Sequence, residues 1–288
     1  MATTAAEALP VALLQLTSGD DPAVNLPVTL DLLKQAAAQG ARLIATPEVT
    51  NILSPARDRQ AQVLRREPQD ETLAALRAAA RDHKVWLLIG SLALLADEGT
   101  DDDRFVNRSF LIDPDGGIVA RYDKIHMFDV DISASESFRE SAAYRPGDRA
   151  VLAKGPQPIG MTICYDLRFP HLYRQLAQAG ARILSIPAAF SPTTGAPHWE
   201  TLLRARAIET GCFVIAPAQT GTHAAPHSPD RTPRQSHGHS LIIDPWGQVL
   251  ADGGTTQGLV TATLDLRAID RARSRIPSLT HDRDFTAP

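Results

Sequence analysis

The chain has 288 residues, of which 43% are hydrophobic and 22% charged, a composition typical of globular proteins. A chain of this length can bury a large core, so its folding requires neither disulfide bonds nor a structural metal. The 29 Lys and Arg residues are scattered among 33 Asp and Glu residues, and the resulting net charge of -4 argues against nucleic acid as a partner.

Short apolar runs alternate with longer segments of helical period, which is the pattern of an α/β protein. We predict strands at residues 11–16, 42–46, 85–93, 109–113, 118–122, 159–163, 182–186, 212–216, 240–244, 249–251 and 258–264. We predict helices at residues 30–37, 73–80, 172–179 and 200–210. Gly40, Gly180 and Gly211 follow three of these helices and readily adopt the left-handed conformation of a helix C-terminus.

Two sequence repeats relate the two halves of the chain. The segment 40–47, Gly-Ala-Arg-Leu-Ile-Ala-Thr-Pro, returns at 180–187 as Gly-Ala-Arg-Ile-Leu-Ser-Ile-Pro. The segment 109–116, which ends in the turn sequence Asp-Pro-Asp-Gly, returns at 240–247 with Asp-Pro-Trp-Gly. Chance similarity is the alternative, but two repeats in the same order favour duplication. Duplication predicts two sheets, each with helices on one face, packed as a four-layer α-β-β-α sandwich in a single domain over residues 1–288.

No predicted segment is suited to a membrane or to secretion. The longest apolar run, 85–96, is interrupted by Gly90 and Ser91 and is shorter than the roughly 20 residues that span a membrane. The first ten residues lack the basic region and the apolar run of a secretory signal. We therefore expect a cytoplasmic protein, in which reducing conditions favour free thiols at Cys164 and Cys212 over a disulfide bond.

Two segments lack an apolar period. Residues 222–237 contain three prolines and are predicted to form a long exposed loop. The polar tail, residues 267–288, is expected either to contact a neighbouring subunit or to fray.

Cys164 is the strongest candidate for a reactive group. It directly follows a predicted strand and precedes Pro170, a residue suited to the first turn of a helix. Functional sites of α/β proteins lie at such strand-to-helix turns, where helix N-termini stabilise negative charge. A thiol with the ordinary pKa of ~8.5 is mostly protonated at neutral pH, so a nucleophile needs a neighbouring base or cation. The alternative is a small buried hydrophobic residue, which applies equally to Cys212.

Glu48 and Lys124 are candidates for that base and that cation. Glu48 follows the strand at 42–46, at an end expected to face the same cleft as Cys164. Its repeat counterpart is Ala188, so the duplicated scaffold does not itself require an acid there; a solvated or capping glutamate is the alternative. Lys124 follows the first hairpin and is suited to holding a thiolate or an oxyanion, with a surface lysine as the alternative.

Taken together, these residues resemble the nitrilase, or carbon-nitrogen hydrolase, superfamily over nearly the whole chain. Its Glu-Lys-Cys triad is matched by Pro47-Glu48, by Asp123-Lys124-Ile125-His126 and by Cys164-Tyr165-Asp166-Leu167-Arg168-Phe169-Pro170. The resemblance is strongest to the Nit branch, through segments 190–195, 198–200, 204–210 and 238–247. Glu140 matches a second glutamate that members keep close to the cysteine. The chain departs from the family in residues 222–237 and in the tail. The resemblance implies the four-layer sandwich, no cofactor and a homodimer.

The resemblance also implies amide hydrolysis through a thioester. Glu48 takes the proton of Cys164, and the thiolate attacks the amide carbonyl. The Lys124 ammonium and the backbone N–H of Tyr165 hold the oxyanion, each worth about 3 kcal/mol to the transition state. Glu48 then protonates the leaving amine and deprotonates the water that hydrolyses the thioester. Glu140 orients Lys124 or that water.

The substrate-binding residues follow from the Nit branch. Arg168 is suited to holding a substrate carboxylate in a two-point contact, and a surface ion pair with Asp166 is the alternative. Phe190 and Thr194 match pocket-lining positions, although Phe190 also fits a core position. The resemblance points to deaminated glutathione, a small-molecule amide cleaved to 2-oxoglutarate and cysteinylglycine. The nearest alternative is an ω-amidase that acts on 2-oxoglutaramate.

Three other functions compete with this one. A transition metal could be bound by the histidines of the 222–239 region, at positions His223, His227, His237 and His239. No carboxylate or cysteine completes that set, so we expect no metal and interpret His239 as support for the second hairpin. A catalytically silent binding or scaffold protein is disfavoured because all four site residues are present. A redox-sensing thiol would need a resolving cysteine close to Cys164.

Overall fold

Two six-stranded sheets form the centre of the molecule, whose computed structural model describes residues 8–99, 102–133 and 136–286. The first sheet has the spatial order β16 (Gly258–Asp265), β1 (Ala8–Gln15), β2 (Leu43–Ala45), β3 (Trp86–Leu94), β4 (Val106–Ile112) and β5 (Ile118–Asp123). The second has the order β15 (Val249–Asp252), β14 (Leu241–Ile243), β11 (Phe213–Ala216), β10 (Ile183–Ser185), β9 (Pro158–Met161) and β8 (Val151–Lys154).

The two sheets have the same plan. Each contains three adjacent parallel strands, β1-β2-β3 in one and β9-β10-β11 in the other. An antiparallel hairpin extends each trio on one side, β4-β5 or β14-β15, and one antiparallel strand extends it on the other, β16 or β8. The equivalence of β2 with β10 and of β4 with β14 agrees with the two sequence repeats.

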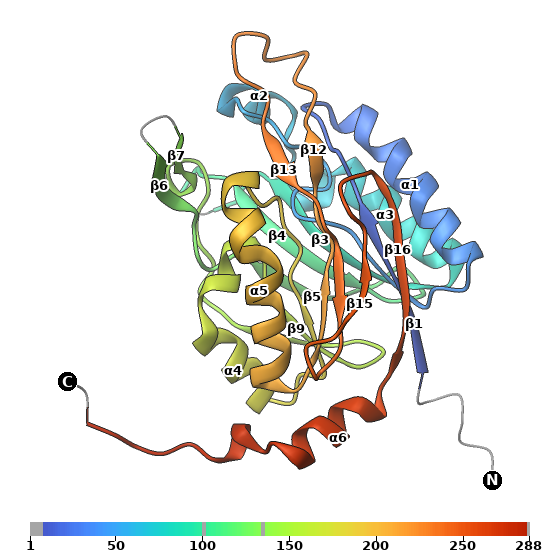
Figure 1. Cartoon of the computed structure of the whole chain (residues 1–288). Helices are drawn as coiled ribbons and strands as arrows, with labels where there is room; N and C mark the ends of the chain where they lie inside the picture. The colour runs from blue at the N-terminus through green and yellow to red at the C-terminus, as the bar shows by residue number, and fades with distance from the viewer. Residues whose placement is uncertain (1–7, 100–101, 134–135, 287–288) are drawn as a thin grey trace.

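Helices cover the outer face of each sheet. Helices α1 (Pro22–Ala38) and α3 (Glu71–His83) lie on the first sheet, and α4 (Pro170–Gln178) and α5 (Pro192–Thr210) lie on the second (Figure 1). Side chains of Asp21 and Asp70 accept hydrogen bonds from the first-turn N–H groups of α1 and α3, and the left-handed Gly211 ends α5. The predicted four-layer α-β-β-α sandwich is thereby confirmed.

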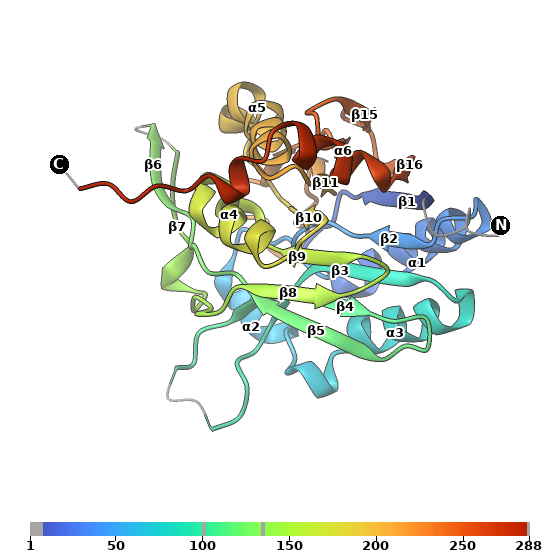
Figure 2. The ribbon, with the colours of Figure 1, turned by 90° about the horizontal axis from the view of Figure 1, so that it is seen from below.

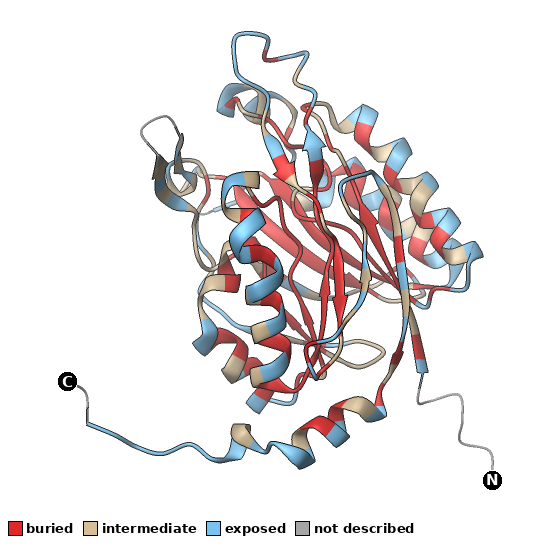
Figure 3. Ribbon diagram, in the orientation of Figure 1, coloured by how far each residue is buried: buried red, intermediate tan, exposed pale blue. Residues whose placement is uncertain are grey.

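Alternation along the strands explains why the layers pack in this way. Leu13 and Leu43 belong to the core between the two sheets, whereas their neighbours Leu14 and Ile44 belong to the core beneath α1 and α3. Successive side chains of a strand point to opposite faces, so strands buried on both faces are apolar throughout. In Figure 3 the central strands of both sheets are buried along most of their length, and exposed positions lie on the outer faces of the helices and in the connecting loops.

Shorter elements complete the fold. The remaining helices are α2 (Arg57–Val63) and α6 (Arg267–Arg275), together with single 3-10 turns at Glu67–Gln69, Glu140–Ala142, Cys164–Arg168 and Ser278–Thr280. Two ribbons are formed by β6 (Asp129–Ser133) with β7 (Glu136–Arg139) and by β12 (Thr220–Thr222) with β13 (Gln235–His237). In the described residues, no helix has both the length and the apolar character to cross a membrane.

The prediction of a long exposed loop at 222–237 is wrong at both ends of that segment. Thr220–Thr222 pair with Gln235–His237 as the β12-β13 ribbon, and His223 is only 1% exposed. The ring of His223 contacts the Ser18 carbonyl oxygen and the Ser236 hydroxyl, both at 2.8 Å. These polar partners allow a segment without apolar period to be held against the body of the protein.

The tail contains an unpredicted helix that packs on its own chain (Figure 2). In α6 the side chain of Ile269 is buried, and Asp270 forms an ion pair of 3.0 Å with Arg182. Beyond α6, the side chains of Arg174 and Gln178 donate to the Ser278 and Leu279 carbonyls. The expected contact of residues 267–288 with a second subunit stays a prediction.

Candidate active site

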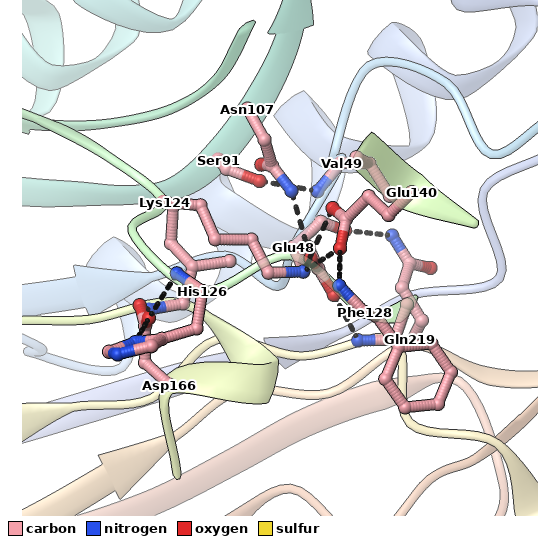
Figure 4. Close-up of polar contacts among 12 residues, drawn as sticks. Glu48, Val49, Ser91, Asn107, Lys124, His126, Phe128, Glu140, Asp166 and Gln219 are labelled. Atoms are coloured by element: carbon pink, nitrogen blue, oxygen red, sulfur yellow. Dashed lines mark hydrogen bonds and ion pairs between the residues drawn. The ribbon is translucent and has the colours of Figure 1, made fainter. Parts of the chain in front are cut away.

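Four ionisable side chains from separate parts of the chain meet in the interior. Glu48 lies beyond the end of β2, Lys124 directly after β5, Glu140 directly after β7, and Cys164 beyond the end of β9. Figure 4 shows the Lys124 side chain directed between the two glutamates. Because the carboxyl ends of strands from both sheets point to this place, residues distant in the sequence become neighbours.

Lys124 is the centre of the cluster. Its ammonium nitrogen lies 2.9 Å from Glu48 Oε1 and 2.9 Å from both carboxylate oxygens of Glu140, and the side chain is 2% exposed. Glu140 Oε2 also accepts a hydrogen bond of 2.6 Å from the backbone N–H of Phe128. A cation buried between two carboxylates is held in one position, because separating opposite charges costs more electrostatic energy in the protein interior than in water.

Glu48 is held by donors on both carboxylate oxygens. Besides Lys124, the Asn107 side-chain amide donates to Oε1 at 2.9 Å (Figure 4). The Ala189 backbone N–H donates to Oε2 at 2.9 Å. The Cys164 thiol is close enough to this carboxylate to lower its pKa. Glu48 therefore lies between the cysteine and the lysine with its orientation determined by the surrounding protein.

Close backbone packing places Glu48 there. A side chain at Gly90 would have its Cβ 2.0 Å from the Thr46 carbonyl oxygen and 2.5 Å from Pro187. Because β3 passes this close to the segments that follow β2 and β10, only glycine fits at this position. The Ser91 hydroxyl accepts the Val49 N–H at 2.8 Å, and Val49 itself has a left-handed backbone with φ of 47°. Such a conformation costs about 1 kcal/mol or more in a residue with a branched side chain, and the neighbouring hydrogen bonds offset it.

Cys164 also has a left-handed backbone, with φ of 49°, at the start of the 3-10 turn Cys164–Arg168. Its N–H donates to the Pro187 carbonyl at 2.9 Å. The N–H groups of a first helical turn, including that of Tyr165, have no acceptor within the helix. This turn therefore presents the thiol next to the backbone N–H of Tyr165.

Asp166 connects this turn to the lysine segment. Its carboxylate is completely buried and accepts hydrogen bonds from the Ile163 N–H at 2.8 Å, the Tyr122 hydroxyl at 2.6 Å and the His126 N–H at 3.0 Å. Tyr122 and His126 lie on either side of Lys124, so one carboxylate aligns the cysteine turn with the lysine.

The pKa values describe a neutral thiol beside an ionised carboxylate. Burial, and then the negative charge of Glu48, raise the pKa of the Cys164 thiol well above its ordinary value. Burial alone would raise the pKa of Glu48, but Lys124 and the hydrogen bonds from Cys164 and Ala189 lower it below the ordinary value. Burial alone would lower the pKa of Lys124, but Glu140 and Glu48 raise it well above the ordinary value. The thiol thus keeps its proton next to a carboxylate that can accept it.

The four side chains line one cavity of about 1050 Å³, including the part open to solvent. Aromatic rings form much of its remaining wall, from residues Phe128, Phe138, Tyr144, Tyr165 and Phe190. Thr194 lines the same cavity, and its buried hydroxyl oxygen has no hydrogen-bond partner among the described residues. The cavity therefore combines an apolar wall with a few polar groups, as small-molecule sites commonly do.

Arg168 does not line this cavity directly. Its guanidinium lies above the rings of Phe190 and Tyr165, at 5.4 and 5.9 Å from their centroids, and 3.4 Å from His198 Nδ1. In the described structure it forms no ion pair with Asp166, so that alternative is wrong. The predicted role of Arg168 in substrate binding stays a prediction.

Two residues of the cluster were not predicted from the sequence. Asn107 orients Glu48, and the sequence indicates Asp166 only as a member of the cysteine motif and as an alternative partner of Arg168. The sequence repeat offers a signal for Asn107. When 109–116 is aligned with 240–247, Asn107 lies opposite Gly238, so the two halves differ at this position. Asp166 has no such signal, since its partners become neighbours only when the two sheets pack.

The loop histidines are dispersed among other partners. His227 contacts Asp21 at 3.4 Å, His239 contacts Asp252 at 3.0 Å, and His237 stacks on His239. Within residues 8–99, 102–133 and 136–286, no group of three or more His, Cys, Asp and Glu side chains is arranged to hold a metal. His239 lies next to the second hairpin, as the sequence suggested.

Comparison with known proteins identifies the family. The carbon-nitrogen hydrolase model matches residues 10–274. A deaminated glutathione amidase of Yersinia enterocolitica is 39% identical, with 95% of this chain and 92% of that protein aligned. The NitFhit protein of C. elegans matches with a TM-score of 0.85 at 34% identity. The match covers 98% of this chain and 66% of the NitFhit chain. Saccharomyces cerevisiae Nit3 has a TM-score of 0.83 at 26% identity, with 97% of both chains covered. The chain belongs to the carbon-nitrogen hydrolase family.

Proposed function

We propose that this carbon-nitrogen hydrolase cleaves deaminated glutathione into 2-oxoglutarate and cysteinylglycine through a thioester on Cys164. The observation that carries the proposal is the burial of a thiol, a carboxylate and an ammonium group in the wall of a single cavity. Relatives that bear the name deaminated glutathione amidase support the choice of substrate.

Acylation uses the proximity of the Cys164 thiol to the Glu48 carboxylate. As the thiol attacks the amide carbon, its proton passes to Glu48, so no free thiolate has to form in the buried site. The negative charge then moves from the carboxylate to the carbonyl oxygen. Lys124 and the Tyr165 N–H stabilise that oxyanion, each by about 3 kcal/mol.

Collapse of the tetrahedral intermediate and deacylation use the same acid. Glu48 returns its proton to the departing amine nitrogen and becomes a carboxylate again. It next removes a proton from water, which attacks the thioester, and Cys164 recovers its proton when it leaves. Glu140 keeps Lys124 in place throughout, since both its oxygens lie 2.9 Å from the ammonium nitrogen.

Arg168, Phe190 and Thr194 bind the acyl part of the substrate in this proposal. The cationic Arg168 lies above Phe190 and Tyr165, two rings that line the cavity, and from there it attracts the 2-oxo acid carboxylate. The unpartnered Thr194 hydroxyl is available to the keto oxygen or the carboxylate.

We also propose a single domain, because both sheets share one continuous core. A cytoplasmic homodimer is proposed as well, with the 267–288 tail at the interface, where Ile276 is 57% exposed and Trp246 is 54% exposed nearby in the fold. Light scattering during size-exclusion chromatography measures the subunit number, and deletion of residues 276–288 should weaken the dimer.

A product assay by mass spectrometry tests the substrate. Deaminated glutathione and 2-oxoglutaramate are offered separately to the wild type and to Cys164→Ala. We expect much higher kcat/KM for the first substrate, and no turnover by the variant. Cleavage of 2-oxoglutaramate alone would instead identify an ω-amidase. If neither is cleaved and iodoacetamide fails to label Cys164, the silent binding protein is the better description.

A further inference from the structure

The cavity has a cationic outer wall that the reaction itself does not require. Besides Lys124, three arginines line it: Arg57 at the start of α2, Arg139 at the end of β7, and Arg234 just before β13. Figure 1 places α2, the β6-β7 ribbon and the β12-β13 connection at the same end of the molecule. Three segments far apart in the sequence thus contribute one guanidinium each.

These arginines differ in how their charge is balanced. Arg139 donates to both carboxylate oxygens of Asp131 at 2.8 Å and to the Val130 and Phe138 carbonyls. Among the described residues, neither Arg57 nor Arg234 forms an ion pair with an acidic side chain. The guanidinium of Arg57 lies 5.9 Å from the Phe105 ring centroid, and that of Arg234 lies 5.8 Å from the Phe138 ring centroid. Their charge is therefore available to an anion inside the cavity.

A row of aromatic rings separates Arg234 from the thiol. The ring of Tyr165, next to Cys164 in the chain, lies 5.0 Å from that of Phe128, which lies 5.1 Å from that of Phe138. Arg234 is stacked on the last ring of this row. Arg168, which lies outside the cavity lining, is stacked on Tyr165 at the first end of this row, and Arg234 is stacked on Phe138 at the other end.

This spacing suits a substrate with an anion on each side of the scissile bond. An extended dipeptide reaches about 7 Å from its amino nitrogen to its terminal carboxylate. If the acyl part lies against Arg168, the terminal carboxylate of a dipeptide leaving group extends along the aromatic row toward the outer arginines. Ammonia as the leaving group would not reach them.

We infer that Arg57 and Arg234 bind a terminal carboxylate on the leaving-amine side. The enzyme would then select amides whose leaving group is a small peptide with a free terminal carboxylate over primary amides. This inference rests on the proposed function, because it assigns the second end of the same site. It predicts that the preference for one amide substrate over another depends on the amine part of the substrate, independently of the acyl part.

The test compares two substrates that differ only at this carboxylate: deaminated glutathione and its C-terminal amide. For the wild type we expect kcat/KM at least tenfold higher for the acid, mainly through a lower KM. In the double variant Arg57→Gln/Arg234→Gln this ratio should fall to about one. The matched control, Arg139→Gln, should keep the ratio because Arg139 is already paired with Asp131. An unchanged ratio in the double variant, or an equal fall in the control, overturns the inference.

Calorimetric binding to the inactive Cys164→Ala variant separates this inference from the proposed function. There the acid should bind at least tenfold more tightly than its amide, and addition of the two Arg→Gln changes should equalise the two affinities. A preference in binding without hydrolysis by the wild type refutes the proposed reaction and retains the carboxylate site. Hydrolysis by the wild type together with equal binding of acid and amide supports the proposed reaction and refutes the carboxylate site.

Discussion

The two halves of the molecule have the same strand order but contribute different groups to the site. Beyond β2 the chain reads Thr46-Pro47-Glu48, and beyond the equivalent β10 it reads Ile186-Pro187-Ala188. The first half thus supplies the carboxylate. The second half supplies the thiol after β9, together with the Ala189 N–H that holds that carboxylate.

This difference shows how a duplicated fold acquires a single site. The backbone of both halves brings strand ends to the same place, which makes that place a common position for side chains from either half. Chemistry requires only one base and one nucleophile, so the second copy of each position is free to serve packing or hydrogen bonding. The proposed catalytic carboxylate thus lies at a position where the two repeats differ, Glu48 in the first and Ala188 in the second.

The largest effect should come from the thiol. We expect Cys164→Ala to lower kcat by at least about 10⁴-fold while the protein stays folded, because a nucleophile cannot be replaced by its neighbours. Cys212 provides the control: it is also buried, but among the described residues its sulfur contacts the Ala181 carbonyl and the Arg273 guanidinium and no carboxylate. Cys212→Ala should remain within about threefold of the wild type by the same mass-spectrometric assay. Comparable losses in the two variants would contradict the assignment.

Removing the base from the first half should be nearly as damaging. Glu48→Gln keeps the size of the side chain but cannot accept a proton, so we expect about a 10³-fold loss in kcat. The same change removes the negative charge that raises the pKa of Cys164, and iodoacetamide labelling of that thiol should therefore begin at lower pH than in the wild type. Exposed Glu200→Gln serves as the control. If labelling keeps the wild-type pH dependence, Glu48 does not act on the thiol.

Removing the shared cation should affect stability more than the other changes. Lys124→Met leaves the buried Glu48 and the half-buried Glu140 without their counter-charge, which should cost about 3–5 kcal/mol of unfolding free energy at pH 7. Urea unfolding measures this cost, and it should shrink when Glu140→Gln is added, because one charge then disappears. A double variant no more stable than Lys124→Met alone would mean that the two carboxylates do not repel each other there.

A smaller effect concerns the contact between the halves at His223 and Ser18. Burial lowers the pKa of His223 to about 4, so the folded protein keeps this ring neutral where the unfolded chain, with a pKa near 6.5, becomes protonated. The contribution of the neutral His223 ring to the free energy of unfolding is therefore fully present above pH 6.5 and is lost as the pH falls toward 4. Between pH 7 and pH 5 the loss is about 2 kcal/mol. His223→Gln should reduce the pH dependence of urea unfolding over this range by that amount, and an identical dependence would disprove the mechanism.

The sequence by itself determined the layered fold and the identity of the central groups. Apolar runs, glycine helix ends and the two repeats predict β2, β4, β10 and β14 with their connections, because these patterns are local and each repeat supports the other. Glu48, Lys124 and Cys164 could be named because each follows a predicted strand and matches a motif.

Only the tertiary structure decided which other residues complete the site. Asn107 contacts Glu48, and Asp166 contacts Tyr122 and His126, across 40 or more residues of the chain, so no local pattern indicates these contacts. Arg57 and Arg234 belong to segments without apolar period, and their shared cavity arises only when α2 and the β12-β13 connection meet at one end of the sandwich. Periodicity reports which face of an element is buried; it does not report what lies opposite that face, which depends on the packing of the whole chain.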